Sequence, residues 1–122
     1  MATHLNMLVV DDEPELRQAL LNQFTEEGFA VDTAEDGDVA LGKIGKNRYD
    51  IVLLDLNMPR MNGMTVLTEM KKLNKYPHVV VLTIVDDLAK ARECVRLGAS
   101  DYLSKPYDPE ELLHVVIKVL SS

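Results

Sequence analysis

The segment 51–55 reads Ile51-Val52-Leu53-Leu54-Asp55, four apolar residues that run directly into an acid. Three other apolar runs also end at polar residues. They are Leu8-Val9-Val10 before Asp11-Asp12, Val79-Val80-Val81-Leu82 before Thr83, and Tyr102-Leu103-Ser104 before Lys105-Pro106. Such runs are typical of strands buried on both faces of a parallel sheet. Because ligands bind at the carboxyl edge of such a sheet, we expect three carboxylates, a hydroxyl and an ammonium group to form a site there.

Amphipathic stretches separate the apolar runs, which indicates repeated βα units. The pattern predicts strands at 7–10, 30–33, 51–54, 78–82 and 101–103, and helices from 14 to before 28, at 37–44, 64–73 and 88–97, and after 108–111. We expect Asp36 to cap the second helix, Gly28 to end the first, and Asp108 to Glu111 to form a capping box with Pro109 at the first helical position. Five right-handed βα units give a doubly wound α/β sandwich.

Helical spacing also predicts which residues the later helices bury. Val66, Met70 and Leu73 share a face of the helix expected at 64–73, and Leu88, Ala91 and Val95 lie on one side of the helix at 88–97. In the last helix, Leu112, Val116 and Leu120 line the buried face, with Leu113 and Ile117 beside them. We further expect Gly63 to supply a backbone angle that the loop before the third helix needs.

The chain has 122 residues, which fits one domain over 1–122. Its formal net charge of −7 argues against binding to duplex nucleic acid or an anionic membrane. A single cysteine, Cys94, excludes an internal disulfide and fits the cytoplasm. We expect no signal peptide and no membrane span. The sequence fits both a complete protein and one domain of a longer protein.

The acids predict a cation site. Helix capping alone would explain one acid at 11 or 12, but not two. Asp55 lies between Leu54 and Leu56, so we expect it to be buried and to need a cation or strong hydrogen-bond donors nearby. Oxygen ligands with room for water suit Mg²⁺ better than Zn²⁺. The three histidines are scattered, and we interpret them as surface or strand-end residues: His4, His78 and His114.

A carboxylate can attack phosphorus and form an acyl phosphate. A cation, a lysine and a hydroxyl can then bind the phosphoryl oxygens. Lys105 and Thr83 are the available pair.

Taken together, these residues resemble the response-regulator receiver domain of two-component signalling over essentially the whole chain. The resemblance rests on Val10-Asp11-Asp12-Glu13-Pro14, on Leu54-Asp55-Leu56-Asn57-Met58-Pro59 followed by Met61-Asn62-Gly63, on Leu82-Thr83, and on Gly98 to Pro106. It implies a flavodoxin-like five-stranded parallel sheet in the order 2-1-3-4-5. It also implies a histidine kinase or phosphotransfer protein as the phosphoryl donor and a downstream effector domain or protein as the output, with no direct binding to nucleic acid or membrane.

The resemblance also implies a role for each site residue. Asp55 would accept the phosphoryl group, and the domain would catalyse only its own phosphorylation and dephosphorylation. Asp12 would bind Mg²⁺ directly, Asp11 mainly through water, and Asn57 through its backbone carbonyl, so that the Asn57 side chain would matter less. Thr83 would bind a phosphoryl oxygen, and Lys105 would pair with Asp55 and then with the phosphoryl group. The Lys105-Pro106 bond would be cis and would aim the lysine inward. Tyr102 would turn inward as a switch.

Each role has a plainer alternative: a buried acid held by Lys105, a β-branched strand residue at Thr83, and a static core tyrosine at Tyr102. Ile84 departs from the family pattern, in which the residue after the threonine is usually small. It predicts slower access for donors or water, and the apolar Val85 predicts slow self-dephosphorylation.

Three other functions are open to such a chain. A pseudo-receiver would use the same fold as a phosphorylation-independent binding module, but no site residue is missing here. An aspartyl-phosphate phosphohydrolase would carry its nucleophile on the first strand and a second acid two residues on, where this chain has Asn57 after Asp55. A flavin-binding domain would need a hydroxyl-rich and glycine-rich loop after the first strand, where this chain is acidic.

Overall fold

The computed structural model describes residues 4–58 and 61–122, together with all side chains in these ranges except that of Val85. The expectations for Pro59 and for the Val85 side chain therefore lie outside the described residues. Five parallel strands form one sheet in the order β2-β1-β3-β4-β5, as predicted. The elements are β1 (Asn6–Val10), α1 (Pro14–Glu26), β2 (Ala30–Ala34), α2 (Gly37–Lys46), β3 (Ile51–Asp55), α3 (Gly63–Lys72), β4 (His78–Ile84), a 3₁₀ turn η1 (Val85–Asp87), α4 (Leu88–Arg96), β5 (Asp101–Lys105) and α5 (Pro109–Leu120).

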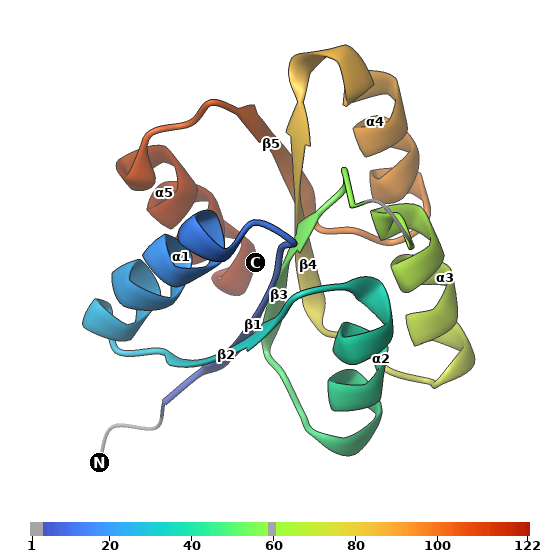
Figure 1. Cartoon of the computed structure of the whole chain (residues 1–122), viewed down its shortest axis with the longest axis horizontal. Helices are drawn as coiled ribbons and strands as arrows, with labels where there is room; N and C mark the ends of the chain where they lie inside the picture. The colour runs from blue at the N-terminus through green and yellow to red at the C-terminus, as the bar shows by residue number, and fades with distance from the viewer. Residues whose placement is uncertain (1–3, 59–60) are drawn as a thin grey trace.

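Helices cover both faces of the sheet. Figure 1 shows α1 and α5 on one side and α2, α3 and α4 on the other. Because successive strand residues point to opposite faces, each central strand contributes to two cores. Leu53 of β3 packs with Phe24 of α1 and Leu112 of α5, whereas Leu54 packs on the other side with Val66 of α3. The unbroken apolar runs of the central strands are explained by this burial on both faces.

The predicted helix signals are confirmed. The Asp36 carboxylate accepts a hydrogen bond of 2.9 Å from the N–H of Val39 at the start of α2. At the start of α5, the Glu111 carboxylate accepts one of 3.1 Å from the N–H of Asp108. Gly28 follows α1 with a φ of +96°, which few residues other than glycine adopt.

The predicted buried faces of α3, α4 and α5 need correction. Leu73 comes after the end of α3 and is 45% exposed, while Leu67 is buried in its place. Val95, predicted to share a face with Leu88 and Ala91, is 38% exposed, and Ile117, predicted to lie beside the buried face of α5, is 53% exposed. The spacing of the residues that do pack explains this result. Ala91 and Cys94 centre the buried stripe of α4, and Leu112, Val116 and Val119 that of α5, so each stripe is rotated slightly from the predicted one.

The prediction for Gly63 was wrong, because this residue begins α3 and has no positive φ. It is instead a point of close approach. A Cβ added there would lie 3.1 Å from Leu56 Cδ1 and 3.3 Å from Leu56 Cα, and Leu56 is buried. The cap of α3 is Asn62, whose side chain accepts a hydrogen bond of 3.0 Å from the N–H of Thr65.

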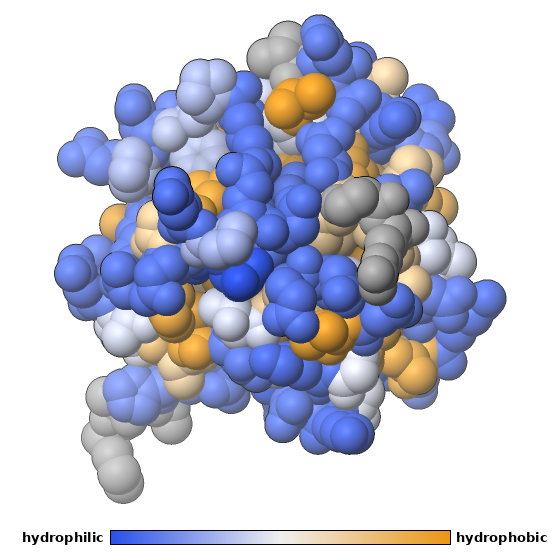
Figure 2. Space-filling view, viewed as in Figure 1, coloured by the Kyte–Doolittle hydropathy of each residue, from blue (hydrophilic) through white to orange (hydrophobic). Residues whose placement is uncertain are grey.

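The surface is mostly hydrophilic in the view of Figure 2, where apolar residues form separate small patches. Within the described part of the chain, no helix has the length and apolar character that crossing a membrane requires. All three histidines are exposed, as predicted, and His78 begins β4.

Gly63→Ala should destabilise the domain by about 1–2 kcal/mol, because the new methyl group meets a buried backbone that cannot move away. Gly42→Ala is the matched control. Gly42 lies within α2 with nothing within 4 Å of an added Cβ, so the free energy of unfolding should rise by about 0.5–1 kcal/mol. Urea unfolding monitored by circular dichroism measures both changes, and equal effects of the two substitutions would contradict this interpretation of Gly63.

Candidate functional site

The sheet brings the predicted site residues to its carboxyl edge. Asp55 is the last residue of β3, and Asp11 directly follows β1, which is the neighbour of β3. Lys105 ends β5, and Thr83 is the second-last residue of β4, one position beyond the register partner of Asp55. Strands β4 and β5 extend two residues further than predicted, so Thr83 and Lys105 lie within the sheet and not after it.

Three carboxylates gather at this edge. One oxygen from each of Asp11, Asp12 and Asp55 lies within 4.8 Å of the others. Asp11 and Asp55 are only 0% and 1% exposed, so two of these groups are held away from bulk water. Backbone donors partly compensate for this loss of water. The N–H of Glu13 donates to Asp11 Oδ1 at 2.9 Å, and the N–H of Asn57 donates to Asp55 Oδ1 at 3.0 Å.

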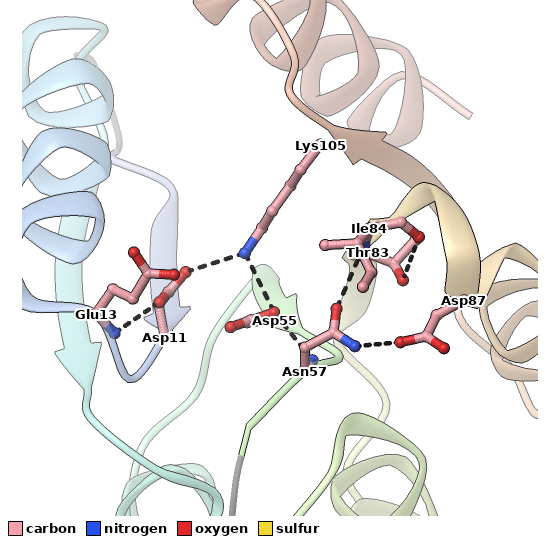
Figure 3. A network of polar contacts seen from close by, with 8 residues as sticks. All are labelled: Asp11, Glu13, Asp55, Asn57, Thr83, Ile84, Asp87 and Lys105. Carbon is pink, nitrogen blue, oxygen red and sulfur yellow. Dashed lines mark hydrogen bonds and ion pairs between the residues drawn. The ribbon is translucent and has the colours of Figure 1, made fainter.

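Lys105 reaches from β5 toward both buried acids, as Figure 3 shows. Its Nζ lies 3.3 Å from Asp55 Oδ1 and 3.9 Å from Asp11 Oδ2. The side chain of Lys105 is only 18% exposed, so this ammonium group is itself partly buried. The Lys105-Pro106 peptide bond is cis, as predicted.

Burial raises the pKa of both buried acids. The pKa of Asp11 rises to about 6, chiefly through burial and also through the charge of Asp55, although the Glu13 N–H and the charge of Lys105 oppose the rise. The pKa of Asp55 is also raised by burial and by the charge of Asp12, against the lowering effect of the Asn57 N–H and Lys105. One lysine therefore does not neutralise the cluster, which favours a second cation.

The donor set fits Mg²⁺. All three side chains offer oxygen, which this hard cation prefers. Asp11 Oδ2 is buried and has no hydrogen-bond partner among the described residues, although a buried carboxylate oxygen normally has one. A cation bound between the carboxylates would satisfy this oxygen and reduce their mutual repulsion.

The two predicted switch residues lie on adjacent strands. Thr83 is fully buried, and its hydroxyl donates to the carbonyl of Ile84 at 3.2 Å. It therefore forms a local hydrogen bond in this structure. Tyr102 is half-buried on β5 and packs against the core beneath α2, α3 and α4.

Sequence reasoning missed two features of the site. The Asn57 side chain, predicted to matter less than its backbone, bonds to Asp87 and to the N–H of Ile84. The only sequence signal for Asp87 was a pair of acids before the fourth helix. The second feature is Tyr107, whose hydroxyl is buried and has no hydrogen-bond partner in residues 4–58 and 61–122. Its pKa is raised to about 12 by burial and by the charges of Asp11 and Asp55. The sequence signal that could have identified Tyr107 is its position directly after Lys105-Pro106.

Comparison with known proteins decides the family. The pattern of the family described as "Response regulator receiver domain" matches residues 7–117. The chain belongs to this family. It is confirmed as a receiver domain of response regulators, with the flavodoxin-like topology that the sequence resemblance implied.

Among curated relatives, the receiver domain is 38% identical to response regulator MprA of Mycobacterium sp. (strain KMS) over 109 residues, which are 89% of this chain and 47% of that protein. It is 36% identical to transcriptional activator protein IrlR of Burkholderia pseudomallei (strain 1026b), covering 95% of this chain and 50% of that one. The chain thus spans about half the length of these curated relatives. Among solved structures, chemotaxis protein CheY4 of Vibrio cholerae has a TM-score of 0.87 at 34% identity, covering 96% of this chain and 99% of that chain.

Asp11→Asn should stabilise the receiver domain by about 1 kcal/mol when no divalent cation is present, because it removes a buried charge that repels Asp55. Millimolar Mg²⁺ should raise the melting temperature of the wild type and have a much smaller effect on the variant. Thermal unfolding with and without Mg²⁺ measures both effects. Glu35→Gln, which removes an exposed charge, is the control and should keep the wild-type response to Mg²⁺. A lower melting temperature for Asp11→Asn in the cation-free protein would contradict this account.

Proposed function

We propose that this domain accepts a phosphoryl group on Asp55 from the phosphohistidine of a histidine kinase or phosphotransfer protein. The observation that carries the proposal is the contact of 3.3 Å between Lys105 Nζ and Asp55 Oδ1, within a cluster of three carboxylates. A buried acceptor, a fixed ammonium group and a set of oxygen ligands are the components that phosphoryl transfer to a carboxylate requires.

The two oxygens of Asp55 have different surroundings. Oδ1 accepts hydrogen bonds from Lys105 and from the N–H of Asn57. Within residues 4–58 and 61–122, Oδ2 accepts no hydrogen bond, so it is the oxygen available for attack. In the proposed reaction Oδ2 forms a bond to phosphorus, the bond from phosphorus to the histidine nitrogen breaks, and its electron pair stays on the imidazole. Lys105 then pairs with a phosphoryl oxygen.

Magnesium has a defined place in the proposal. Asp11 and Asp12 would hold the ion with Asp55, Asp12 directly and Asp11 mainly through water, and the Asn57 carbonyl would complete the protein ligands. When bound, Mg²⁺ neutralises charge on the phosphoryl oxygens. The chain itself orients the acceptor through the Asn57 N–H and Lys105. The same residues would allow hydrolysis of the product, so the domain acts on its own acyl phosphate and on no separate substrate.

The proposed output is a conformational switch. To bind a phosphoryl oxygen, the Thr83 hydroxyl must leave the carbonyl of Ile84. We expect this rotation to make room for Tyr102 on the neighbouring strand, which would turn inward and change the surface of α4, β5 and α5. This surface carries two exposed apolar residues, Val95 and Ile117, for an effector domain or protein to contact.

A groove beside the site is the proposed binding surface for the phosphoryl donor. A groove of about 470 Å³ lies between α1 and the connection from β5 to α5, and its lining includes Leu16, Leu20, Lys105 and Tyr107. This groove is mainly apolar and is lined by Lys105, which contacts Asp55, so it suits a helix that presents a phosphohistidine. We propose the cytoplasm as the location, which fits the buried and reduced Cys94.

Incubation with acetyl phosphate and Mg²⁺ tests the proposal. One phosphoryl adduct should appear in the intact mass, and it should be absent without Mg²⁺ and in Asp55→Asn, which lacks the nucleophilic carboxylate. Asp50→Asn, an acid at the opposite edge of the sheet, is the control and should keep the adduct. If neither acetyl phosphate nor several histidine kinases yield an adduct, the domain is instead a pseudo-receiver that binds its partner without phosphorylation.

Ile84→Ala should speed phosphorylation by acetyl phosphate, or the decay of the acyl phosphate, by severalfold. The reason is that the Ile84 side chain is 44% exposed at the rim of the site, in register with Lys105. Ile117→Ala removes an exposed isoleucine of α5, away from the site, and should leave both rates unchanged. Time-resolved mass spectrometry gives the rates of phosphorylation and of acyl phosphate decay. If both rates of Ile84→Ala equal those of the wild type, the prediction is contradicted.

A further inference from the structure

The Asn57 side chain joins two segments that lie far apart in the sequence. Its amide nitrogen Nδ2 donates to Asp87 Oδ2, and its Oδ1 accepts a hydrogen bond of 3.3 Å from the N–H of Ile84. Figure 3 shows this side chain between Asp55 on one side and Asp87 and Ile84 on the other. Asn57 therefore links the loop after the acceptor strand to the connection between β4 and α4.

Asp87 lies at the beginning of α4. It ends the turn η1 and directly precedes the first residue of the helix. Its side chain is 21% exposed and lies 3.8 Å from Lys90 Nζ, one turn into α4. A hydrogen bond to an ionised carboxylate is stronger than a neutral one, so the contact with Asn57 fixes the position of this turn relative to the site.

The backbone of Ile84 is held at both of its polar groups. The N–H is bonded to Asn57, and the carbonyl accepts the hydroxyl of Thr83 at 3.2 Å. If Thr83 rotates toward a phosphoryl group, the Ile84 carbonyl loses the Thr83 hydroxyl. Ile84 can then shift only if its N–H, which belongs to the preceding peptide group, is released from Asn57. The bonds of Asn57 therefore oppose the movement that the proposed switch requires.

We propose that Asn57 and Asp87 form a latch that stabilises the unphosphorylated arrangement of the connection between β4 and α4 and thereby slows phosphorylation of Asp55. The latch consists of the Asn57–Asp87 bond and the bond from the Ile84 N–H to Asn57. The side chains of Asn57 and Asp87 have positioning roles here, since they act through Ile84 and Thr83, whereas it is the backbone of Asn57 that contacts Asp55. This inference rests on the proposed function.

The latch predicts a rate effect of defined size. A reaction that requires one conformation of a protein becomes faster when the competing conformation, here the latched one, is destabilised. Loss of one partly exposed hydrogen bond to a charged group corresponds to about a fivefold shift in such an equilibrium. The phosphorylation rate should rise by the same factor.

The experiment compares rates of adduct formation from acetyl phosphate and Mg²⁺ in several variants of the full chain. Asp87→Ala should react about fivefold faster than wild type. Asp87→Asn keeps an acceptor oxygen without the charge, so its rate should fall between the two. Asp86→Ala is the matched control, because it removes an exposed acid from the same turn that makes no hydrogen bond or ion pair with the described residues, and it should react at the wild-type rate.

Two further measurements separate the latch from a general loss of structure. In the Asn57→Ala background, adding Asp87→Ala should cause no further acceleration, because Asp87 has already lost its partner. Amide hydrogen exchange should be faster at the Ile84 N–H in Asp87→Ala than in Asp86→Ala, even without a phosphodonor.

The outcomes distinguish the latch from the function on which it rests. If the wild type forms no adduct with any donor, the proposed function fails and the latch has no reaction to slow. If the wild type forms the adduct and Asp87→Ala reacts no faster than Asp86→Ala, the latch is overturned while the proposed function stands. Faster reaction of Asp87→Ala alone, with faster exchange at Ile84, supports the latch.

Discussion

The burial of the Asp55 carboxylate beside Lys105 constrains this domain more than any other interaction. Asp55 is 1% exposed, and an unpaired charge at such a position would be strongly unfavourable. Lys105 compensates by approaching to 3.3 Å from a different strand. The contact requires β3 and β5 to end at the same edge of the sheet, although β4 lies between them. The topology of the whole sheet is therefore needed to place one ion pair.

The two sides of the site are held by different kinds of contact. On the side of β1 and β3, backbone N–H groups of Glu13 and Asn57 hold the acids within turns that follow the buried ends of these strands. On the side of β4, the contacts are made by side chains, the Thr83 hydroxyl and the Asn57 amide. The proposed phosphoryl transfer would use the first kind of contact, and the proposed switch would use the second, because a switch needs a segment with two arrangements.

The distribution of packing supports this division. Central strands contribute to both cores through alternate residues, so the sheet itself cannot move without disrupting both. Helix α4, in contrast, buries only Ala91 and Cys94 and leaves Val95 exposed. A helix that buries two small side chains needs polar contacts at its beginning to define its position, and the interactions of Asp87 with Asn57 and Lys90 lie there.

The sequence by itself predicted the strand order through the family resemblance, and it predicted the strands and the Asp36, Gly28 and Asp108–Glu111 helix signals through local patterns. It also indicated which polar residues meet at the carboxyl edge of the sheet. Apolar runs that end at Asp55 and Thr83 are local signals, and so is the Asp36 cap, because each depends on neighbours along the chain. The tertiary structure decided the rest. Helical periodicity could not fix the rotation of α4 and α5, since it leaves adjacent positions such as Cys94 and Val95 nearly equivalent until a partner surface selects one. The role of the Asn57 side chain was also out of reach, because its partner is 30 residues away and only the packed fold brings the two together.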